Sequence, residues 1–428
     1  AKLFQGKDSI LSGPAGGVVG MVHTAAENYF KKVIGFDMGG TSTDVSHYDG
    51  FYERSFETQV AGIRMRTPMM SIHTVAAGGG SILQFDNGRY QVGPYSAGAL
   101  PGPSSYRRGG PLTIMDCNLM LGKIKGKFFP HIFGKDADQP LDYDIVKKSF
   151  RKLANDIEKV IGNKRSLEQV AEGFLIIAVE NMANAIKQIS VQRGYDITED
   201  ILNSFGGAGG QHACLVADAL GMKTVLIHPL AGVLSAYGMG LAKIRSMREH
   251  SCEISLDYKG LKSLAPIIRK LKHETSKDIE SQGIDKTTIF IICKIYIRYA
   301  GTDTAISVEY DNEIKMIKAF EASHKKRFGF VMAGRRLVIE TLSIEALGGD
   351  QTTPKQQRKD TLNKTLPAQL EVTEFFSGGK LYQAPVYQRE TLVPGNIIQG
   401  PAIIIEKTGT TIVEPDWKAK TGSEKQLI

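Results

Sequence analysis

Residues 33–56 place a glycine-rich turn between two strand-like segments, and this order limits the folds open to the chain. Residues 33–37 are mostly apolar and end at an aspartate, and residues 44–48 return to β-favouring side chains after the turn. The hairpin signal at residues 49–50 leads into residues 51–56, which we expect to form a third strand. The predicted order is therefore strand, glycine turn, strand.

That order argues against the two commonest phosphate-binding loops. Walker-type and Rossmann loops lead from a strand into a helix, whereas β-favouring residues follow the glycines in this chain. A β-hairpin whose glycine turn holds a phosphate is the arrangement of actin-like ATPases. The hairpin therefore favours an actin-like α/β fold.

The turn carries the pattern Asp-x-Gly-Gly-Thr-x-x-Asp, which is built from Asp37, Gly39, Gly40, Thr41 and Asp44. Glycines let backbone N–H groups approach phosphate oxygens closely, and a threonine hydroxyl can donate to the same group. Carboxylates beside such a turn commonly hold hydrated Mg²⁺. The pattern predicts a site for phosphate and magnesium, and the alternative is an ordinary glycine hairpin with two capping aspartates.

A second glycine cluster, Gly78, Gly79 and Gly80, lies in a region rich in glycine and proline that extends to residue 111. A stretch this long without a clear period is usually functional or flexible. Short strand-like runs interrupt it, so we expect functional loops. His73 precedes the cluster and is a candidate acid or base; the alternative is a histidine that satisfies a buried backbone group.

A third glycine cluster follows the strand expected at residues 201–205. Its glycines are Gly206, Gly207, Gly209 and Gly210. A helix over residues 211–220 and a strand over residues 223–228 complete a βαβ unit, whose turn suits phosphate or adenosine contact or a tight structural turn. His212 is a second acid–base candidate, because a helix N-terminus lowers the pKa of a histidine; a buried structural role is its alternative.

Helical periodicity predicts helices over residues 142–160 and, capped by Ser166, up to about Arg193. A chain of 428 residues is too long for one ordinary core. We expect a catalytic core over residues 1–248 and a C-terminal α+β, β-rich domain over residues 249–428.

Composition and charge argue against several classes of partner and location for the chain. The net charge of +8 is scattered rather than gathered into an aromatic-lined stripe, which argues against nucleic acid as a partner. The longest apolar run, residues 174–179, is too short to span a bilayer, and no signal peptide opens the chain. The four cysteines are widely spaced, which argues against a zinc site or disulfide framework and favours the cytoplasm.

Several separate segments resemble the hydantoinase A/5-oxoprolinase family, and they come in the order that the family has. The likeness covers about residues 9–245 and extends in shorter matches nearly to the C-terminus. The segments are residues 12–20, 35–46, 72–82, 93–103, 205–213, 234–241, 298–305 and 400–404.

This resemblance implies an actin-like ATPase core of the ribonuclease H-like class, with the Asp37 pattern as its second phosphate loop. ATP and Mg²⁺ are the implied cofactors, and a monovalent cation is a further candidate. Family members normally carry another such loop in an N-terminal domain, which does not precede Ala1. We therefore expect this chain to be a piece of a longer protein. On its own, we expect it to bind nucleotide poorly. A B-type partner subunit and an oligomeric assembly are also implied.

The resemblance implies ATP-dependent opening of a cyclic amide, in which the amide oxygen is phosphorylated before water attacks the ring carbon. Asp37 and Asp44 would position Mg²⁺ or the reacting water, and His73 would act as acid or base. His212, Arg298 and Asp303 are candidate substrate contacts, since Arg298 could pair with a substrate carboxylate. An ion pair within the domain is the alternative role for Arg298.

Three functions remain open at this point. The first is an amidohydrolase acting on 5-oxoproline or a hydantoin, with the segment 298–305 favouring 5-oxoproline. The second is the A-type or β subunit of a related ATP-dependent acetone or acetophenone carboxylase. The third is a non-catalytic actin-like nucleotide-binding module, which we rank last because heat-shock chaperone ATPases lack the segments 12–20 and 93–103.

Overall fold

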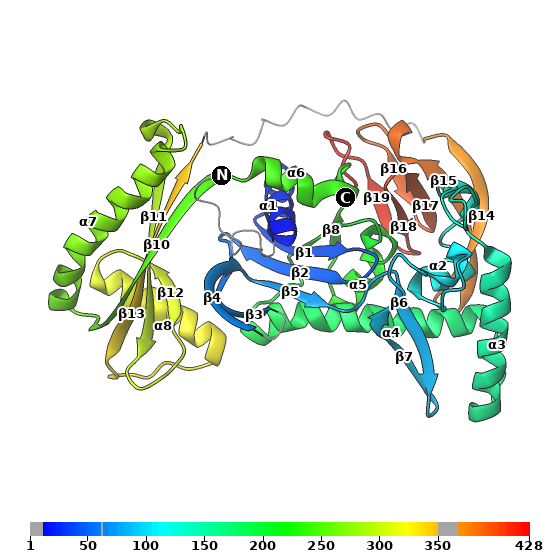
Figure 1. The fold of residues 1–428 in the computed structure, drawn as a ribbon, viewed down its shortest axis with the longest axis horizontal. Helices are drawn as coiled ribbons and strands as arrows, with labels where there is room; N and C mark the ends of the chain where they lie inside the picture. The colour runs from blue at the N-terminus through cyan, green and yellow to red at the C-terminus, as the bar shows by residue number, and fades with distance from the viewer. Residues whose placement is uncertain (1–11, 61–62, 350–366) are drawn as a thin grey trace. The chain divides into compact units, whose positions relative to one another are not determined.

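The computed structural model describes residues 12–60, 63–349 and 367–428 (Figure 1). These residues divide into two compact units. The first unit holds residues 12–192, 196–241 and 367–428, and the second holds residues 193–195 and 242–349.

A five-stranded sheet forms the centre of the first unit, in the order β5-β2-β1-β8-β9. Only β2 runs antiparallel to its neighbours, while β8 and β9 continue parallel to β1. This order and polarity are those of the ribonuclease H-like, actin-like sheet, so the predicted α/β fold class is confirmed. The strands are β1 (Lys32–Met38), β2 (Thr43–Asp49), β5 (Ile72–Val75), β8 (Ile201–Phe205) and β9 (Thr224–Leu226).

Helices cover both faces of this sheet (Figure 1). On one face lie α1 (Ser12–Glu27) and α6 (Leu234–Leu241), and Met21 of α1 meets the Ser46 hydroxyl of β2 at 3.6 Å. On the other face α4 (Leu167–Ile189) packs against β2 and β5. Two faces covered by helices leave the strand ends and their turns as the places where a ligand can reach the backbone.

The helix α4 has the cap that its sequence predicts. The Ser166 hydroxyl accepts the Gln169 N–H, and the Gln169 side chain accepts the Ser166 N–H in return. The stretch Leu167–Arg193 is long and apolar enough to cross a membrane, but 56% of its most apolar window is buried inside the structure. That burial against the sheet is the pattern of a core helix.

The other helices of this unit are α2 (Ile114–Met120), α3 (Tyr143–Ile161) and α5 (Ala213–Leu220). The Asp142 side chain accepts the Ile145 N–H at 3.0 Å and begins α3. The predicted βαβ unit is confirmed, because α5 connects the parallel strands β8 and β9.

The third strand of the hairpin region differs from our prediction. The segment after Gly50 does not extend the central sheet beyond one bridge between Tyr48 and Tyr52. Instead β3 (Arg54–Val60) pairs with β4 (Ile63–Met70) in a separate ribbon, and β5 takes the place beside β2. The glycine-rich region that follows contains a second hairpin, β6 (Ser81–Asp86) and β7 (Arg89–Ser96).

The C-terminal strands over residues 367–428 belong to the same compact unit as the central sheet. Backbone bonds join the two parts, from the Phe376 N–H to Leu121 O at 2.8 Å and in both directions between Ile227 and Leu427. These strands are β14 (Gln369–Ser377), β15 (Lys380–Gln388), β17 (Ala402–Glu406) and β18 (Gly409–Val413), with the pair β16 (Ile397–Gln399) and β19 (Lys418–Lys420).

The second unit is an antiparallel sheet covered by two helices. Its strands have the order β10-β13-β11-β12, and they span Ile244–Ser255, Leu337–Gly348, Phe290–Tyr299 and Ile306–Glu309. Leu264 and Ile268 of α7 (Tyr258–Glu280) and Phe320 of α8 (Glu313–Phe328) pack with strand residues such as Ile295 and Leu342 in one core. Strands and helices together give this unit the α+β character that we expected for this part of the chain.

A buried histidine between two acids should make the stability of the first unit depend on pH. His47 of β2 is 3% exposed, with Nδ1 2.8 Å from Glu53 Oε1 and Nε2 3.7 Å from Asp200 Oδ2. Burial alone would lower the pKa of His47, but the hydrogen bonds and charges of Asp200 and Glu53 outweigh it and raise that pKa above 6.5. The stabilisation is therefore complete below pH 6.5 and lost as the pH rises through the raised pKa.

We accordingly expect His47→Gln to lower the free energy of unfolding by about 2 kcal/mol at pH 6 and by less at pH 9. Urea unfolding at the two pH values measures this difference. The exposed His131 offers a matched control, and His131→Gln should change neither value. An equal loss at both pH values for His47→Gln would show that the imidazole acts by packing rather than by charge.

Candidate functional site

The two aspartates of the predicted phosphate turn face each other across the first hairpin. Asp37 of β1 and Asp44 of β2 are directly paired, so their side chains lie on the same face of the sheet. Thr74 of β5 extends the row, and its hydroxyl donates to Asp44 Oδ1 at 2.6 Å. A threonine that the sequence did not indicate thus fixes the Asp44 carboxylate.

Ser235 of α6 is a second partner that the sequence did not indicate. Its hydroxyl donates to Asp37 Oδ2 at 3.2 Å. Burial raises the pKa of Asp37 to about 6; the Ser235 hydrogen bond lowers it, and the negative charge of Asp44 adds to the rise. The segment 234–241 had been noted as a motif, but only the packing of α6 near the end of β1 shows what its serine touches.

The turn between the aspartates is open. The Gly39 N–H donates to Ser42 O at 3.0 Å and closes the turn. Gly40 and Thr41 are exposed, and a Cβ atom on Gly40 would meet nothing within 4 Å. Across the described part of the chain, neither the Gly40 N–H nor the Thr41 hydroxyl has a hydrogen-bond partner. The turn therefore presents unengaged donors, which the phosphate site expected from the sequence would require.

The second glycine cluster supports the first rather than presenting donors of its own. The Gly79 N–H donates to Gly39 O at 3.1 Å and the Gly80 N–H to Gly40 O at 2.6 Å. The Gly78 N–H donates to the Ser81 hydroxyl at 2.9 Å. We predicted that Gly78, Gly79 and Gly80 bind the nucleotide directly. Their N–H groups are instead used inside the protein, and a Cβ on Gly78 would lie 2.7 Å from Ser42 N.

The third glycine cluster divides into two roles. Gly206 has φ +79° and directs its N–H to Ala231 O at 3.0 Å, and a Cβ there would lie 2.6 Å from Asp37 Oδ1. Gly207 is exposed, and its N–H has no partner among the residues that the structure describes. Gly206 therefore lets the chain pass beside Asp37, and Gly207 presents an open donor.

The other two glycines of this cluster are buried and allow close packing. A Cβ on Gly209 would lie 2.7 Å from the Ser204 hydroxyl, and one on Gly210 would lie 2.9 Å from Thr410 O. Neither position can face a ligand, which corrects their predicted role as nucleotide contacts.

Substitution of Gly206 should separate the effect of its left-handed backbone from the effect of its close approach to Asp37. In Gly206→Ala the new methyl group meets Asp37 and Met38, and the left-handed backbone adds about 1 kcal/mol of strain. Gly162 has φ +75° with nothing within 4 Å, so Gly162→Ala carries the strain alone. We expect Gly206→Ala to lose more thermal stability than Gly162→Ala, because it adds a clash to the strain, and only Gly206→Ala to lose most of its ATP-dependent turnover. Equal turnover in the two variants would contradict the placement of Gly206 in the site.

His73 lies on the wrong face of the sheet for the catalytic role that we predicted. It pairs with Val45, whereas Thr74 pairs with Asp44. Because alternate strand residues point to opposite faces, His73 points away from Asp37 and Asp44, toward the face that α4 covers. The structure therefore does not bring His73 together with the two aspartates.

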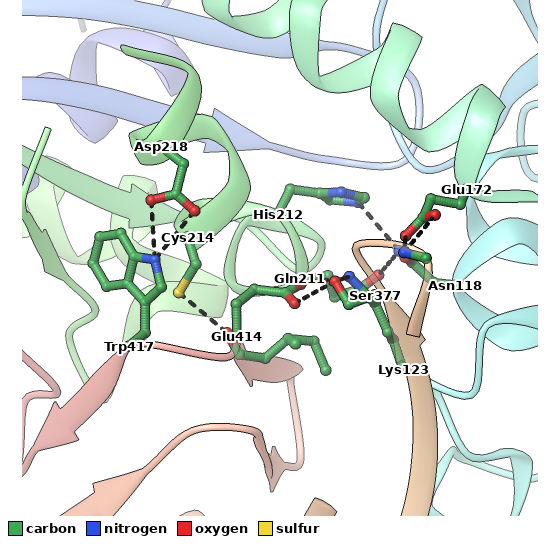
Figure 2. A network of polar contacts seen from close by, with 12 residues as sticks. Asn118, Lys123, Glu172, Gln211, His212, Cys214, Asp218, Ser377, Glu414 and Trp417 are labelled. Atoms are coloured by element: carbon green, nitrogen blue, oxygen red, sulfur yellow. Dashed lines mark hydrogen bonds and ion pairs between the residues drawn. The ribbon is translucent and has the colours of Figure 1, made fainter. Parts of the chain in front are cut away.

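His212 is also removed from solvent. Its side chain lies in a buried layer with Asn118 and Gln211, 3.2 Å from Asn118 Nδ2 at its Nε2 atom (Figure 2). Burial, aided by the charge of Lys123, lowers the pKa of His212 to about 3. The imidazole is neutral, as expected, but burial rather than the helix N-terminus is the main cause. A residue 1% exposed is not a substrate contact, so that prediction is corrected.

Arg298 and Asp303 lie in the second unit. Arg298 forms ion pairs with Glu253 Oε2 at 2.7 Å and Glu340 Oε2 at 3.4 Å, so the alternative of an ion pair within the domain holds. Asp303 is exposed in the connection between β11 and β12. The guanidinium already has two carboxylate partners, and its predicted pairing with a substrate would have to displace them.

Asp37 and Asp44 are the residues that could hold Mg²⁺. Mg²⁺ is commonly bound by one or two carboxylates together with waters and substrate phosphates. The raised pKa of Asp37 reflects burial and the nearby charge of Asp44, both of which a divalent cation would offset. Outside the undescribed segments, no group of three or more His, Cys, Asp or Glu side chains could hold a metal ion. The pair therefore suits a hydrated magnesium and not a fully protein-ligated metal.

Comparison with known proteins places these features in a family. The family model for hydantoinase/oxoprolinase matches residues 1–248, and the model for the hydantoinase/oxoprolinase C-terminal domain matches residues 257–427. The 5-oxoprolinase of Dictyostelium discoideum is 38% identical over 434 residues, which cover 97% of this chain and 34% of that protein.

Two further likenesses concern caprolactamase. The caprolactamase subunit alpha of Pseudomonas jessenii is 29% identical, over 96% of this chain and 60% of that protein. The crystal structure of the ATP-dependent caprolactamase from Pseudomonas jessenii superposes with a TM-score of 0.84 at 28% identity, over 97% of this chain and 61% of that one.

This chain spans about a third of the length of the 5-oxoprolinase that it matches.

Proposed function

The chain belongs to the hydantoinase/oxoprolinase family, and from this premise we propose that it forms the nucleotide-binding part of an enzyme that uses ATP to open a cyclic amide. The observation that carries the proposal is the meeting of three glycine segments at one carboxylate pair. Gly40 and Gly207 present open N–H groups there, and Asp37 and Asp44 lie beside them.

We propose 5-oxoproline as the substrate. The support is the 38% identity to a protein named 5-oxoprolinase, compared with 29% identity to a caprolactamase subunit. Both names describe lactam-opening enzymes. The reaction class is therefore better supported than the particular ring.

The chemistry explains why ATP is required. An unstrained lactam resists water, and transfer of the γ-phosphoryl group to its oxygen makes the ring carbon electrophilic. Water then adds to that carbon, the ring C–N bond breaks with proton transfer to nitrogen, and the acyl phosphate left behind is hydrolysed by a second water. The products are glutamate, ADP and inorganic phosphate.

The residues of this chain would bind and orient the reacting phosphate. The N–H groups of Gly40 and Thr41 and the Thr41 hydroxyl are placed to donate to its oxygens. Asp37 and Asp44 would hold Mg²⁺, which neutralises charge on the phosphates, and Ser235 and Thr74 would fix the two carboxylates. Positioning and charge neutralisation of this kind supply most of the catalysis of phosphoryl transfer.

We also propose a partner subunit and a reducing, cytoplasmic setting. The name of one relative, caprolactamase subunit alpha, supports an assembly of more than one kind of chain. The four cysteines are unpaired, which supports a reducing compartment. Burial raises the pKa of Cys117 and Cys214, the latter to about 12, so neither thiol is suited to act as a nucleophile.

Phosphate release by the full-length protein, with its partner subunit where one exists, tests the substrate. Candidate rings and the ketone alternative are added one at a time: 5-oxoproline, a hydantoin, and acetone or acetophenone with bicarbonate. We expect release to depend on 5-oxoproline. Dependence on a hydantoin would identify a hydantoin, and not 5-oxoproline, as the ring that is opened. Dependence on a ketone would indicate carboxylation in place of ring opening. Nucleotide binding without stimulation by any of them would indicate a non-catalytic module.

A further inference from the structure

The tip of the β17–β18 hairpin lies against the third glycine cluster. A Cβ on Gly207 would lie 3.5 Å from Thr408 O, and a Cβ on Gly409 would lie 3.5 Å from Gly207 O. Thr408 also covers Gly232, where a Cβ would lie 2.6 Å from the Thr408 Cβ and hydroxyl. Two segments far apart in the sequence therefore share one small surface beside the open Gly207 N–H.

A buried network fixes the strand that carries this tip. The Cys214 thiol of α5 donates to Ile412 O of β18 at 3.4 Å, and Gly210 packs on Thr410. One residue beyond β18, the Glu414 carboxylate pairs with the buried Lys123 ammonium (Figure 2). The position of the tip relative to Gly207 is therefore set by packed elements and not by a free loop.

The two residues at the tip are exposed. Throughout the described residues, Lys407 has no ion pair or hydrogen bond that would occupy its ammonium group. Ala208, the neighbour of Gly207, donates its N–H to Met38 O at 3.0 Å, which ties this turn to the end of β1 beside Asp37. The exposed Lys407 thus directly precedes Thr408, the residue that lies against a turn with an open backbone donor. That turn adjoins Asp37, one of the carboxylates proposed to hold Mg²⁺.

These contacts suit a polyphosphate. Phosphate oxygens accept hydrogen bonds from backbone N–H groups and from lysine, which acts on them as a mobile point charge. A neutral ligand would gain little from an ammonium group at this place. The two aspartates would repel a carboxylate ligand unless a cation compensates, whereas a magnesium-bound nucleotide brings that cation with it.

We propose that Lys407 is a nucleotide-binding residue: the β17–β18 tip closes one side of the nucleotide site at Gly207, and the Lys407 ammonium contacts the phosphates of the bound nucleotide. This inference rests on the proposed function, because it assumes that the site at Asp37 and Gly207 binds nucleotide. It assigns to the C-terminal strands a part in binding that neither their sequence nor the order of the central sheet indicates.

The test compares Lys407→Ala, Lys407→Arg and the control Lys380→Ala in the full-length protein. Lys380 is an exposed lysine next to the tip of the neighbouring β14–β15 hairpin. Calorimetry measures the Kd of MgATP, and steady-state kinetics measures kcat and the KM for MgATP. We expect Lys407→Ala to raise Kd and KM about tenfold with kcat within about twofold, as loss of uniform binding predicts. Arginine should restore most of the affinity, and Lys380→Ala should match the wild type.

Gly232→Ala gives a second route to the same result, because its methyl group would displace Thr408 and the tip with it. We expect Gly232→Ala to raise the Kd of MgATP, and Lys407→Ala to add little in the double variant.

The inference would be overturned if Lys407→Ala bound MgATP like the wild type. If the wild-type protein binds MgATP but opens no ring, the proposed function is wrong. The Kd of MgATP for the Lys407 variants then still tests the inference. A wild-type protein that bound no nucleotide would overturn both.

Discussion

Asp37→Asn is expected to lower ATP-dependent turnover about 10³-fold while leaving the protein folded. Asp37 is one of two carboxylates beside the open turn, and its Oδ2 atom is held by Ser235 at 3.2 Å. The substitution keeps the shape of the side chain but removes the charge that Mg²⁺ needs. Because burial already raises the pKa of Asp37 to about 6, a neutral side chain should not weaken the fold at neutral pH.

Two measurements on the same sample separate these effects. Steady-state kinetics gives the loss of turnover, and thermal unfolding without added magnesium gives the change in stability. Asp86→Asn is the matched control, since Asp86 is an exposed aspartate at the end of β6, and it should leave both quantities unchanged. Turnover within tenfold of the wild type in Asp37→Asn would show that the carboxylate pair does not hold the magnesium of the reacting nucleotide.

The second large effect is expected at the buried ion pair between Lys123 and Glu414. The two side chains are 1% and 4% exposed, and the Ser377 hydroxyl donates to Glu414 Oε2 at 2.7 Å (Figure 2). Removing one partner leaves the other charge buried and unpaired, which costs about 3–5 kcal/mol. We therefore expect Glu414→Gln to lower the free energy of unfolding by that amount in urea denaturation.

A double variant separates charge from packing. Lys123→Met with Glu414→Leu removes both charges together, and it should recover most of the stability that Glu414→Gln loses. The ion pair between Lys127 and Glu371 provides the control, because Lys127 is 61% exposed. Lys127→Met should cost less than about 1 kcal/mol. A loss of the same small size for Glu414→Gln would mean that the pair does not attach the C-terminal strands to the core.

The parts of the fold that depend on local sequence could be predicted. The hairpin of β1 and β2, the capped helix α4 and the βαβ unit of β8, α5 and β9 follow from periodicity and from cap and turn residues a few positions apart. The open glycine turn between Asp37 and Asp44 follows for the same reason. Each of these features is fixed by neighbours along the chain.

The parts that depend on distant contacts could not be predicted. Ser235 is nearly two hundred positions from Asp37, and nothing in its own segment indicates which residue it bonds. The return of residues 367–428 to the first unit rests on contacts such as Lys123 with Glu414, whose charges look like surface charges in the sequence. A residue's neighbours in space, and not its type, decide these roles.

His73 and the glycines show a second reason why the site residues could not all be predicted from the sequence. Strand alternation would have placed His73 away from Asp44 once the pairing with β2 was known, but the sequence does not give that register. Glycines that present N–H groups to a ligand and glycines that allow close packing look alike in sequence. Only the hydrogen bonds of Gly79 and Gly80 and the packing of Gly209 and Gly210 distinguish them.

Ring opening measured together with phosphate release is the most direct test of the central claim. The full-length protein is supplied with 5-oxoproline and ATP, and glutamate and inorganic phosphate are quantified in the same reaction, with a parallel reaction that lacks ATP. We expect the two products in equal amounts, neither without ATP, and both formed about 10³-fold more slowly by Asp37→Asn. Glutamate formed without ATP, or phosphate released with no ring opened, would contradict an ATP-dependent opening of the ring at this site.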